Sequence, residues 1–126
     1  MQKEIVYSDN APKPIGPYSQ AVISGGFLFA SGQIALEPET GNLVMASIEA
    51  ETRQVMANIE ALLTAANLGF KSIIKTSIFL KNMDDFAKVN EVYASYFESD
   101  FPARETVQVA KLPKDVNVEI SVVAVV

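Results

Sequence analysis

The sequence predicts a single α+β domain, spanning residues 1–126, in which two helices cover one face of a mixed β-sheet. The chain has the usual size of one domain and shows no composition shift that would divide it. A hairpin pattern near the N-terminus is followed by a helical, a strand-like and a second helical segment, and then by two more strand-like segments. Neither an internal repeat nor a low-complexity tract interrupts this order.

The N-terminal part predicts short strands joined by loops. The extended segments are residues 5–7, 20–24 and 27–31. Gly25 and Gly26 separate the last two, and this spacer supplies the positive φ angles of a tight hairpin turn. The prolines of residues 10–17 fit neither a helix nor a central strand, so they indicate an ordered loop. Residues 37–42 indicate a further turn.

Two segments have helical periodicity. Apolar side chains recur at helical spacing over residues 47–68, and two glutamates lie near the positive end of the helix dipole. We expect Gly69 to end this helix as a left-handed cap. Asn82 can cap a second helix that carries an apolar and aromatic stripe and ends near Phe97.

The remaining segments predict three strands. Residues 73–80 are rich in β-branched side chains and short enough for a strand. Residues 104–110 and 116–126 are the last two strands, and the second is apolar enough to lie in the sheet centre. Local sequence alone would join these two as a hairpin across residues 111–114.

The absence of two residue types excludes several kinds of chemistry. The chain has no cysteine and no histidine. This excludes thiol nucleophiles, disulfides, Cys/His zinc sites, Ser-His-Asp triads and histidine acid–base catalysis.

Charge and hydropathy indicate the expected partners. The formal charge of −5 and the lack of a basic stripe make nucleic acid an unexpected partner. Apolar residues form 49% of the chain, so we expect part of that surface to meet another subunit. A charged N-terminal segment and the lack of a membrane-length apolar run predict a cytoplasmic protein without membrane contact.

Arg104 and Glu119 are the strongest chemical candidates. Strand alternation places Arg104 and Thr106 on one face, and Glu119 lies between two apolar neighbours where an unpaired charge would be costly. The residues leave two interpretations open. In the first interpretation, Arg104 and Glu119 form a structural ion pair. In the second, the planar Arg104 guanidinium binds a ligand carboxylate through two hydrogen bonds.

Three other positions are weaker candidates. Asn90 lies on the apolar stripe of the second helix, so its amide needs a hydrogen-bond partner, and bracing of the backbone would supply one. Tyr18 follows the proline-rich loop and could close over a ligand or merely pack. Ser31 and Gly32 end a strand, where a hydroxyl and open backbone can face a cleft or simply form a turn.

Taken together, five segments resemble the YjgF/RidA family, in order and at the family's spacing. They are Gly16-Pro-Tyr-Ser-Gln-Ala21, Phe29-Ala-Ser-Gly-Gln-Ile34, Val89-Asn-Glu-Val-Tyr93, Phe101-Pro-Ala-Arg-Glu-Thr-Val-Gln-Val-Ala-Lys-Leu-Pro113 and Val118-Glu-Ile120. The resemblance implies a chorismate-mutase-like fold, a homotrimer with three clefts between neighbouring subunits, and a final strand inserted between others.

The resemblance also implies an activity, the hydrolysis of 2-iminobutanoate, 2-iminopropanoate and their enamine tautomers to 2-oxoacids and ammonia. Arg104 would hold the substrate carboxylate, and Glu119 would orient or deprotonate the attacking water. The cleft would be lined by Tyr18, Ser31, Gly32, Asn90 and the backbone of Thr106. An iminium carbon is already electrophilic, so neither a metal nor another cofactor is expected.

Two positions depart from the common pattern of the family. Glu105 follows the arginine where many members carry a small residue, and strand parity turns it away from the cleft face. Thr106 stands where many members have cysteine, so thiol-dependent behaviour is not expected here.

Two other functions remain open. One is a non-catalytic module that binds a 2-oxoacid or an amino acid in the same cleft. The other is an endoribonuclease or translation inhibitor, against which the acidic charge and the lack of histidine argue.

Overall fold

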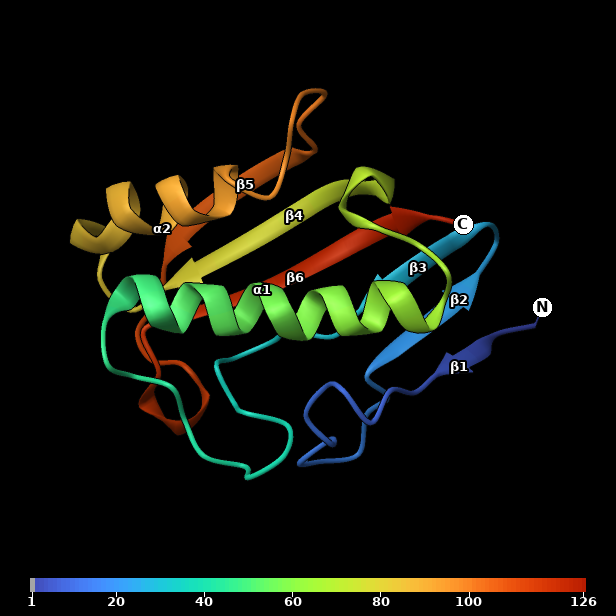
Figure 1. Ribbon diagram of the computed structural model, residues 1–126, viewed down its shortest axis with the longest axis horizontal. Coiled ribbons are helices and arrows are strands. Elements are labelled where there is room, and N and C mark those ends of the chain that lie inside the picture. The colour runs from blue at the N-terminus through green and yellow to red at the C-terminus, as the bar shows by residue number, and fades with distance from the viewer. Residues whose placement is uncertain (1) are drawn as a thin grey trace.

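In the computed structural model, which describes residues 2–126, a six-stranded mixed sheet carries two α-helices on one face (Figure 1). Met1, the first residue of the predicted domain, lies outside the described residues. The strands are β1 (Glu4–Val6), β2 (Ala21–Ser24), β3 (Phe27–Ala30), β4 (Ile73–Leu80), β5 (Ala103–Gln108) and β6 (Val118–Val125). The predicted fold class is confirmed.

The strand order is β1-β2-β3-β6-β4-β5, with β4 and β5 parallel and every other pair antiparallel. The last strand therefore lies in the sheet centre, as its apolar sequence predicts. The hairpin expected from local sequence is wrong, because β6 pairs with β3 and β4, while β5 lies at the edge of the described sheet and pairs with β4. Insertion between two strands pairs the backbone of β6 on both edges and buries its apolar face.

The β2–β3 hairpin forms as predicted. Gly25 and Gly26 have φ angles of 61° and 85°, which glycine adopts without steric cost. The turn pairs Ser24 with Phe27 and sets the register of both strands.

Helix α1 (Ile48–Ala65) begins where the Ser47 side chain accepts a hydrogen bond from the Ala50 amide. Its predicted end is wrong, because Asn67 adopts the left-handed conformation with φ of 60° while Gly69 is extended. Asparagine tolerates this region better than most residues, so the helix stops before the glycine is reached.

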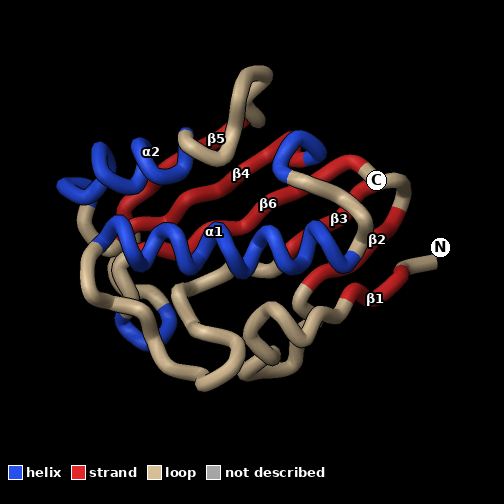
Figure 2. Tube along the Cα trace, in the orientation of Figure 1, coloured by secondary structure: helices blue, strands red, loops and turns tan. Residues whose placement is uncertain are grey.

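Helix α2 (Phe86–Ala94) follows a short 3₁₀ turn, Met83–Asp85. Asn82 caps that turn through the Asp84 amide, and the α-helix ends before the predicted Phe97. Both helices lie on the same side of the sheet, and the long loops gather near one end of it (Figure 2).

The main core lies between the sheet and the helices. Val118, Ile120 and Val122 of β6 are buried there against α1. Successive side chains of a strand point to opposite faces, so Glu119 faces away from the helices. Within residues 2–126, no helix is long and apolar enough to cross a membrane.

Candidate functional site

The candidate residues lie in two groups on opposite faces of the sheet. Arg104 is paired with Thr76 in the β4–β5 ladder, and both side chains contact α2. Glu119 is paired with Phe79 of β4 and points to the face without helices. Among residues 2–126, no ion pair joins Arg104 to Glu119. The structural ion pair considered from sequence does not form within one chain.

The guanidinium of Arg104 is held in a fixed orientation. Its Nη1 donates a hydrogen bond of 2.7 Å to Asn90 Oδ1. Its central carbon lies 5.2 Å from the ring centroid of Tyr93 and 5.6 Å from that of Phe86, within cation–π range. The ion pairs of the described chain all belong to lysines. Arg104 therefore keeps donors for an external anion, since a guanidinium carries five.

Two α2 side chains support this arginine. Asn90 bonds to the Arg104 side chain rather than bracing backbone. The Tyr93 hydroxyl donates a 2.9 Å hydrogen bond to Thr76 Oγ1, and burial raises the pKa of this phenol, so it stays neutral. A cavity of about 410 Å³ borders Arg104 and Asn90. Nearby, the buried Oγ1 of Thr106 has no hydrogen-bond partner among the described residues.

Glu105 points to the other face of β5, as strand parity predicts. Its carboxylate pairs with Lys75 at 2.8 Å and accepts a hydrogen bond from Ser77. The hydrogen bond from Lys75 is the main reason that the pKa of Glu105 lies below its usual value. The acidic residue beside Arg104 thus has its own partners and does not neutralise the guanidinium.

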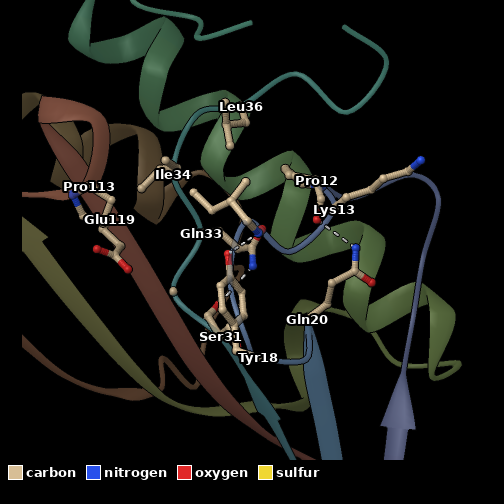
Figure 3. A pocket seen from close by; sticks show the side chains of 12 residues that line it. Pro12, Lys13, Tyr18, Gln20, Ser31, Gln33, Ile34, Leu36, Pro113 and Glu119 are labelled. Carbon is tan, nitrogen blue, oxygen red and sulfur yellow. Dashed lines mark hydrogen bonds between the residues drawn. The ribbon is translucent and has the colours of Figure 1, made fainter. Parts of the chain in front are cut away.

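The second group surrounds a cavity of about 330 Å³, into which Glu119 of β6 and Tyr18 of a preceding loop project from different segments (Figure 3). Gly32 lies directly against the Glu119 carboxylate. A Cβ added to Gly32 would overlap Glu119 Oε2 and lie 2.9 Å from Glu119 Cδ. A side chain at this position would therefore displace the Glu119 carboxylate from where it lies.

Backbone pairing brings Gly32 to this place. The Gln33 amide donates to the Ile120 carbonyl at 2.8 Å, and the Ile120 amide donates back at 3.1 Å. This bridge holds the segment after β3 along the edge of β6. Residue 32 then lies beside residue 119.

Glu119 is half-buried, and its burial raises the pKa of the carboxyl group. From residues 2–126, no side-chain hydrogen bond or ion pair reaches this carboxylate. A carboxylate that lacks a partner and has a raised pKa can accept a proton from a bound water.

Tyr18 and Ser31 also line the cavity beside Glu119. Ser31 Oγ donates a 2.6 Å hydrogen bond to the Ser19 carbonyl. Tyr18 Oη accepts a 3.3 Å hydrogen bond from the Ile15 amide, and its ring lies close to Gly16. The first bond ties the segment that follows the proline-rich loop to the end of β3, and the second holds Tyr18 against the loop itself.

Sequence reasoning missed Gln20, whose buried amide holds that loop. Its Oε1 accepts from the Ser8 amide at 2.7 Å, and its Nε2 donates to the Ser8 carbonyl at 3.0 Å and the Pro12 carbonyl at 2.9 Å. The sequence placed Gln20 in the predicted strand over residues 20–24 and in the family segment Gly16–Ala21, but neither assigned its side chain a role.

Two buried polar residues of α1 hold other segments that border this cavity, and the sequence analysis did not single them out. Asn58 donates to the carbonyls of Ile34 at 3.1 Å and Leu36 at 2.9 Å. Glu51 accepts from the Asn117 amide at 2.8 Å, just before β6. Both residues interrupt the helical apolar pattern, and this was the signal that could have found them.

Each group is chemically incomplete. The first offers an oriented cation without a nearby acid, and the second offers an acid that pairs with no cation of the described residues. Among residues 2–126, no cluster of carboxylates could hold a metal ion.

The comparisons with known proteins assign the family. The sequence model of the family described as "Endoribonuclease L-PSP" matches residues 8–126. The chain is 53% identical to the RutC family protein PH0854 of Pyrococcus horikoshii, covering 97% of each chain. It is 44% identical to the chloroplastic Reactive Intermediate Deaminase A of Arabidopsis thaliana, covering 98% of this chain and 66% of that protein.

A solved structure agrees with these sequence matches. The protein YyfA of Yersinia pestis, described as a member of the conserved Rid protein family, superposes with a TM-score of 0.97 at 49% identity, covering 99% of this chain and 100% of that one. The chain belongs to the YjgF/RidA family. The resemblance seen in the sequence is confirmed, and the mixed sheet with its two helices is the Rid fold.

Proposed function

We propose that this Rid protein hydrolyses 2-iminobutanoate, 2-iminopropanoate and their enamine tautomers to 2-oxoacids and ammonia, in clefts between the subunits of a homotrimer. The observation that carries the proposal is the separation of Arg104 from Glu119 on opposite faces of one sheet. A single chain cannot bring both groups to one small substrate. Two copies can, when the Arg104 face of one meets the Glu119 face of the next.

In this arrangement one copy supplies Tyr18, Ser31, Gly32 and Glu119. The neighbouring copy supplies Asn90, Arg104 and the backbone of Thr106. Support comes from the unpaired donors of Arg104, the unpartnered carboxylate of Glu119 and a relative named Reactive Intermediate Deaminase A.

The reaction follows from these two groups. Arg104 binds the substrate carboxylate and fixes the imine carbon next to Glu119. Glu119 takes a proton from a water molecule while the water oxygen bonds to that carbon, which gives a carbinolamine. The proton then passes to the nitrogen, Glu119 takes the proton of the carbinolamine hydroxyl as the C–N bond breaks, and ammonia leaves as the 2-oxoacid forms. The carboxyl group then gives that proton to the ammonia or to water, which restores the carboxylate. The imine carbon is electrophilic from the start, so the chemistry needs no covalent nucleophile.

A non-catalytic module that binds 2-oxoacids would use Arg104 equally well. It would have no use for Glu119, because a second anion beside the ligand carboxylate weakens binding. An endoribonuclease fits the description of the family model, but the formal charge of −5 opposes binding of a polyanion.

The test is imine decay in the presence of the protein. Threonine dehydratase and threonine generate 2-iminobutanoate, and its loss is followed against a reaction without the protein. Arg104→Lys should lower kcat/KM by about 10²-fold, because lysine cannot reproduce the two-point geometry. Arg53→Lys, at an exposed arginine of α1, is the matched control and should match the wild type. Equal activity of Arg104→Lys and wild type would rule out the carboxylate anchor.

A further inference from the structure

The cavity beside Glu119 has an apolar half that the proposed chemistry does not use. Its floor is formed by the buried side chains of Ile34 and Leu36, each 7% exposed. Ile34 lies toward Glu119 and Pro113, whereas Leu36 lies farther from the carboxylate (Figure 3). Ile15, 60% exposed, lines the rim of the same cavity.

The side-chain amide nitrogens that border the apolar half donate hydrogen bonds within the chain. The Gln20 amide is used by the backbone of the adjacent loop, and Gln33 Nε2 donates to the Ser31 carbonyl at 3.1 Å. Lys13 borders the cavity, but its side chain extends away from Glu119 (Figure 3). A polar substituent placed against the side chains of Ile34 and Leu36 would lose hydrogen bonds to water and contact only carbon atoms there.

In the single chain, the cavity is larger than a small imine would fill. Its volume of about 330 Å³ corresponds to roughly ten water molecules at ~30 Å³ each. The methyl group of 2-iminopropanoate would leave most of the apolar wall in contact with water. A branched side chain of four carbons would cover Ile15, the most exposed member of that wall.

We infer that this apolar half is a subsite for the side chain of the substrate, and that it selects 2-imino acids with longer aliphatic side chains over 2-iminopropanoate. The inference rests on the proposed function, which places the imine carbon beside Glu119. The carboxylate then points toward the neighbouring copy, and the side chain is left facing Ile15, Ile34 and Leu36. Each buried methylene should raise kcat/KM by about fourfold.

The experiment compares imines that differ only in side chain. An L-amino-acid oxidase generates them from alanine, 2-aminobutanoate, leucine and asparagine, and semicarbazide traps whatever the protein has not hydrolysed. Asparagine is the matched control for leucine, because its side chain has the same shape but is polar. We expect kcat/KM to rise at least tenfold from the alanine to the leucine imine, and to fall again for asparagine.

Two variants locate the effect. Ile15→Ala should lower kcat/KM for the leucine imine several-fold and leave the alanine imine within about twofold. Ile15 is exposed, so its replacement should not disturb folding. Ile74→Ala, at another exposed isoleucine that does not line the cavity, should change neither imine.

Binding of the 2-oxoacid products separates this inference from the proposed function. Calorimetry should show tighter binding of 4-methyl-2-oxopentanoate than of pyruvate, with the difference reduced in Ile15→Ala. A flat or falling series in both turnover and binding would overturn the subsite while leaving imine hydrolysis intact. Loss of every turnover signal, with the binding preference retained, would overturn the proposed function and keep the subsite.

Discussion

The surroundings of Glu119 support its proposed role as a base. Its side chain alternates with core residues of β6, lies against Gly32, and has no partner within the described chain. Glu119→Gln keeps the shape and removes the base, so kcat should fall by about 10²–10⁴-fold. In the wild type, the raised pKa should place the acid limb of kcat/KM above 4.5, the ordinary value for glutamate. A pH–rate profile with a limb at or below 4.5, or near-normal turnover of Glu119→Gln, would contradict this role.

The same variant also distinguishes a base from a structural ion pair. A carboxyl whose pKa is raised in the folded state favours folding at low pH, and this contribution is lost as pH rises through the raised pKa. Glu119→Gln should therefore be at least as stable as wild type at neutral pH, as thermal unfolding would show. Glu60→Gln, at an exposed glutamate of α1, is the control. A clearly lowered Tm of Glu119→Gln would point to a lost partner instead.

Gly32 gives a second prediction at the residue scale. The added Cβ of Gly32→Ala would overlap the Glu119 carboxylate, so that carboxylate must move away from the substrate. Turnover should fall by about 10²-fold, the usual scale for a displaced catalytic group, while circular dichroism stays unchanged. Gly69→Ala should keep its activity, because within residues 2–126 no atom beyond the adjacent residues lies within 4 Å of the added Cβ. Full activity of Gly32→Ala would show that the position of Glu119 is not critical.

At the scale of elements, the sequence identified most segments but not how they pair. The strand over residues 73–80 was predicted with its observed bounds, because β-branched content and length agreed. The end of α1 was missed because Asn67 and Gly69 both permit a left-handed cap, and only packing selects between them.

The pairing of β6 depends on contacts far apart in sequence. Periodicity gives the face of each side chain within a strand but not the neighbouring strand or the face relative to the helices. Sequence reasoning could therefore single out Arg104 and Glu119, and yet could not tell that they lie on opposite faces. The resemblance to a family predicted that the final strand is inserted between others, whereas the local sequence pattern did not.

Helix α1 positions part of the site through Asn58, and this supports a prediction at the element scale. Asn58→Ala would leave the buried carbonyls of Ile34 and Leu36 without their donor. We expect a loss of about 1–3 kcal/mol in the free energy of unfolding, measured by urea denaturation at one fixed protein concentration. Thr64→Ala, at an exposed position of the same helix, should stay within about 0.5 kcal/mol. Equal stability of the two variants would contradict the bracing role.

At the scale of the whole molecule, the face of the sheet without helices exposes apolar side chains to solvent. One row of apolar side chains crosses four adjacent strands on that face. In this row Ile5 pairs with Val22, Val22 with Phe29, and Phe29 with Val123. Ile5 is 53% and Phe29 48% exposed in the single chain. An apolar row of this kind is typical of surfaces that pack against another copy, which agrees with the apolar composition of the chain.

The central claim is that each active site takes Arg104 from one copy and Glu119 from the next, and mixing two inactive variants tests it directly. Arg104→Ala and Glu119→Ala are unfolded together in equal amounts and refolded, and native mass spectrometry confirms mixed trimers before the assay. Because each half-site is drawn independently, roughly a quarter of the sites should regain both groups, and imine hydrolysis should return to about that fraction of wild type. A mixture of confirmed mixed trimers that stays as inactive as its two components would contradict the shared site.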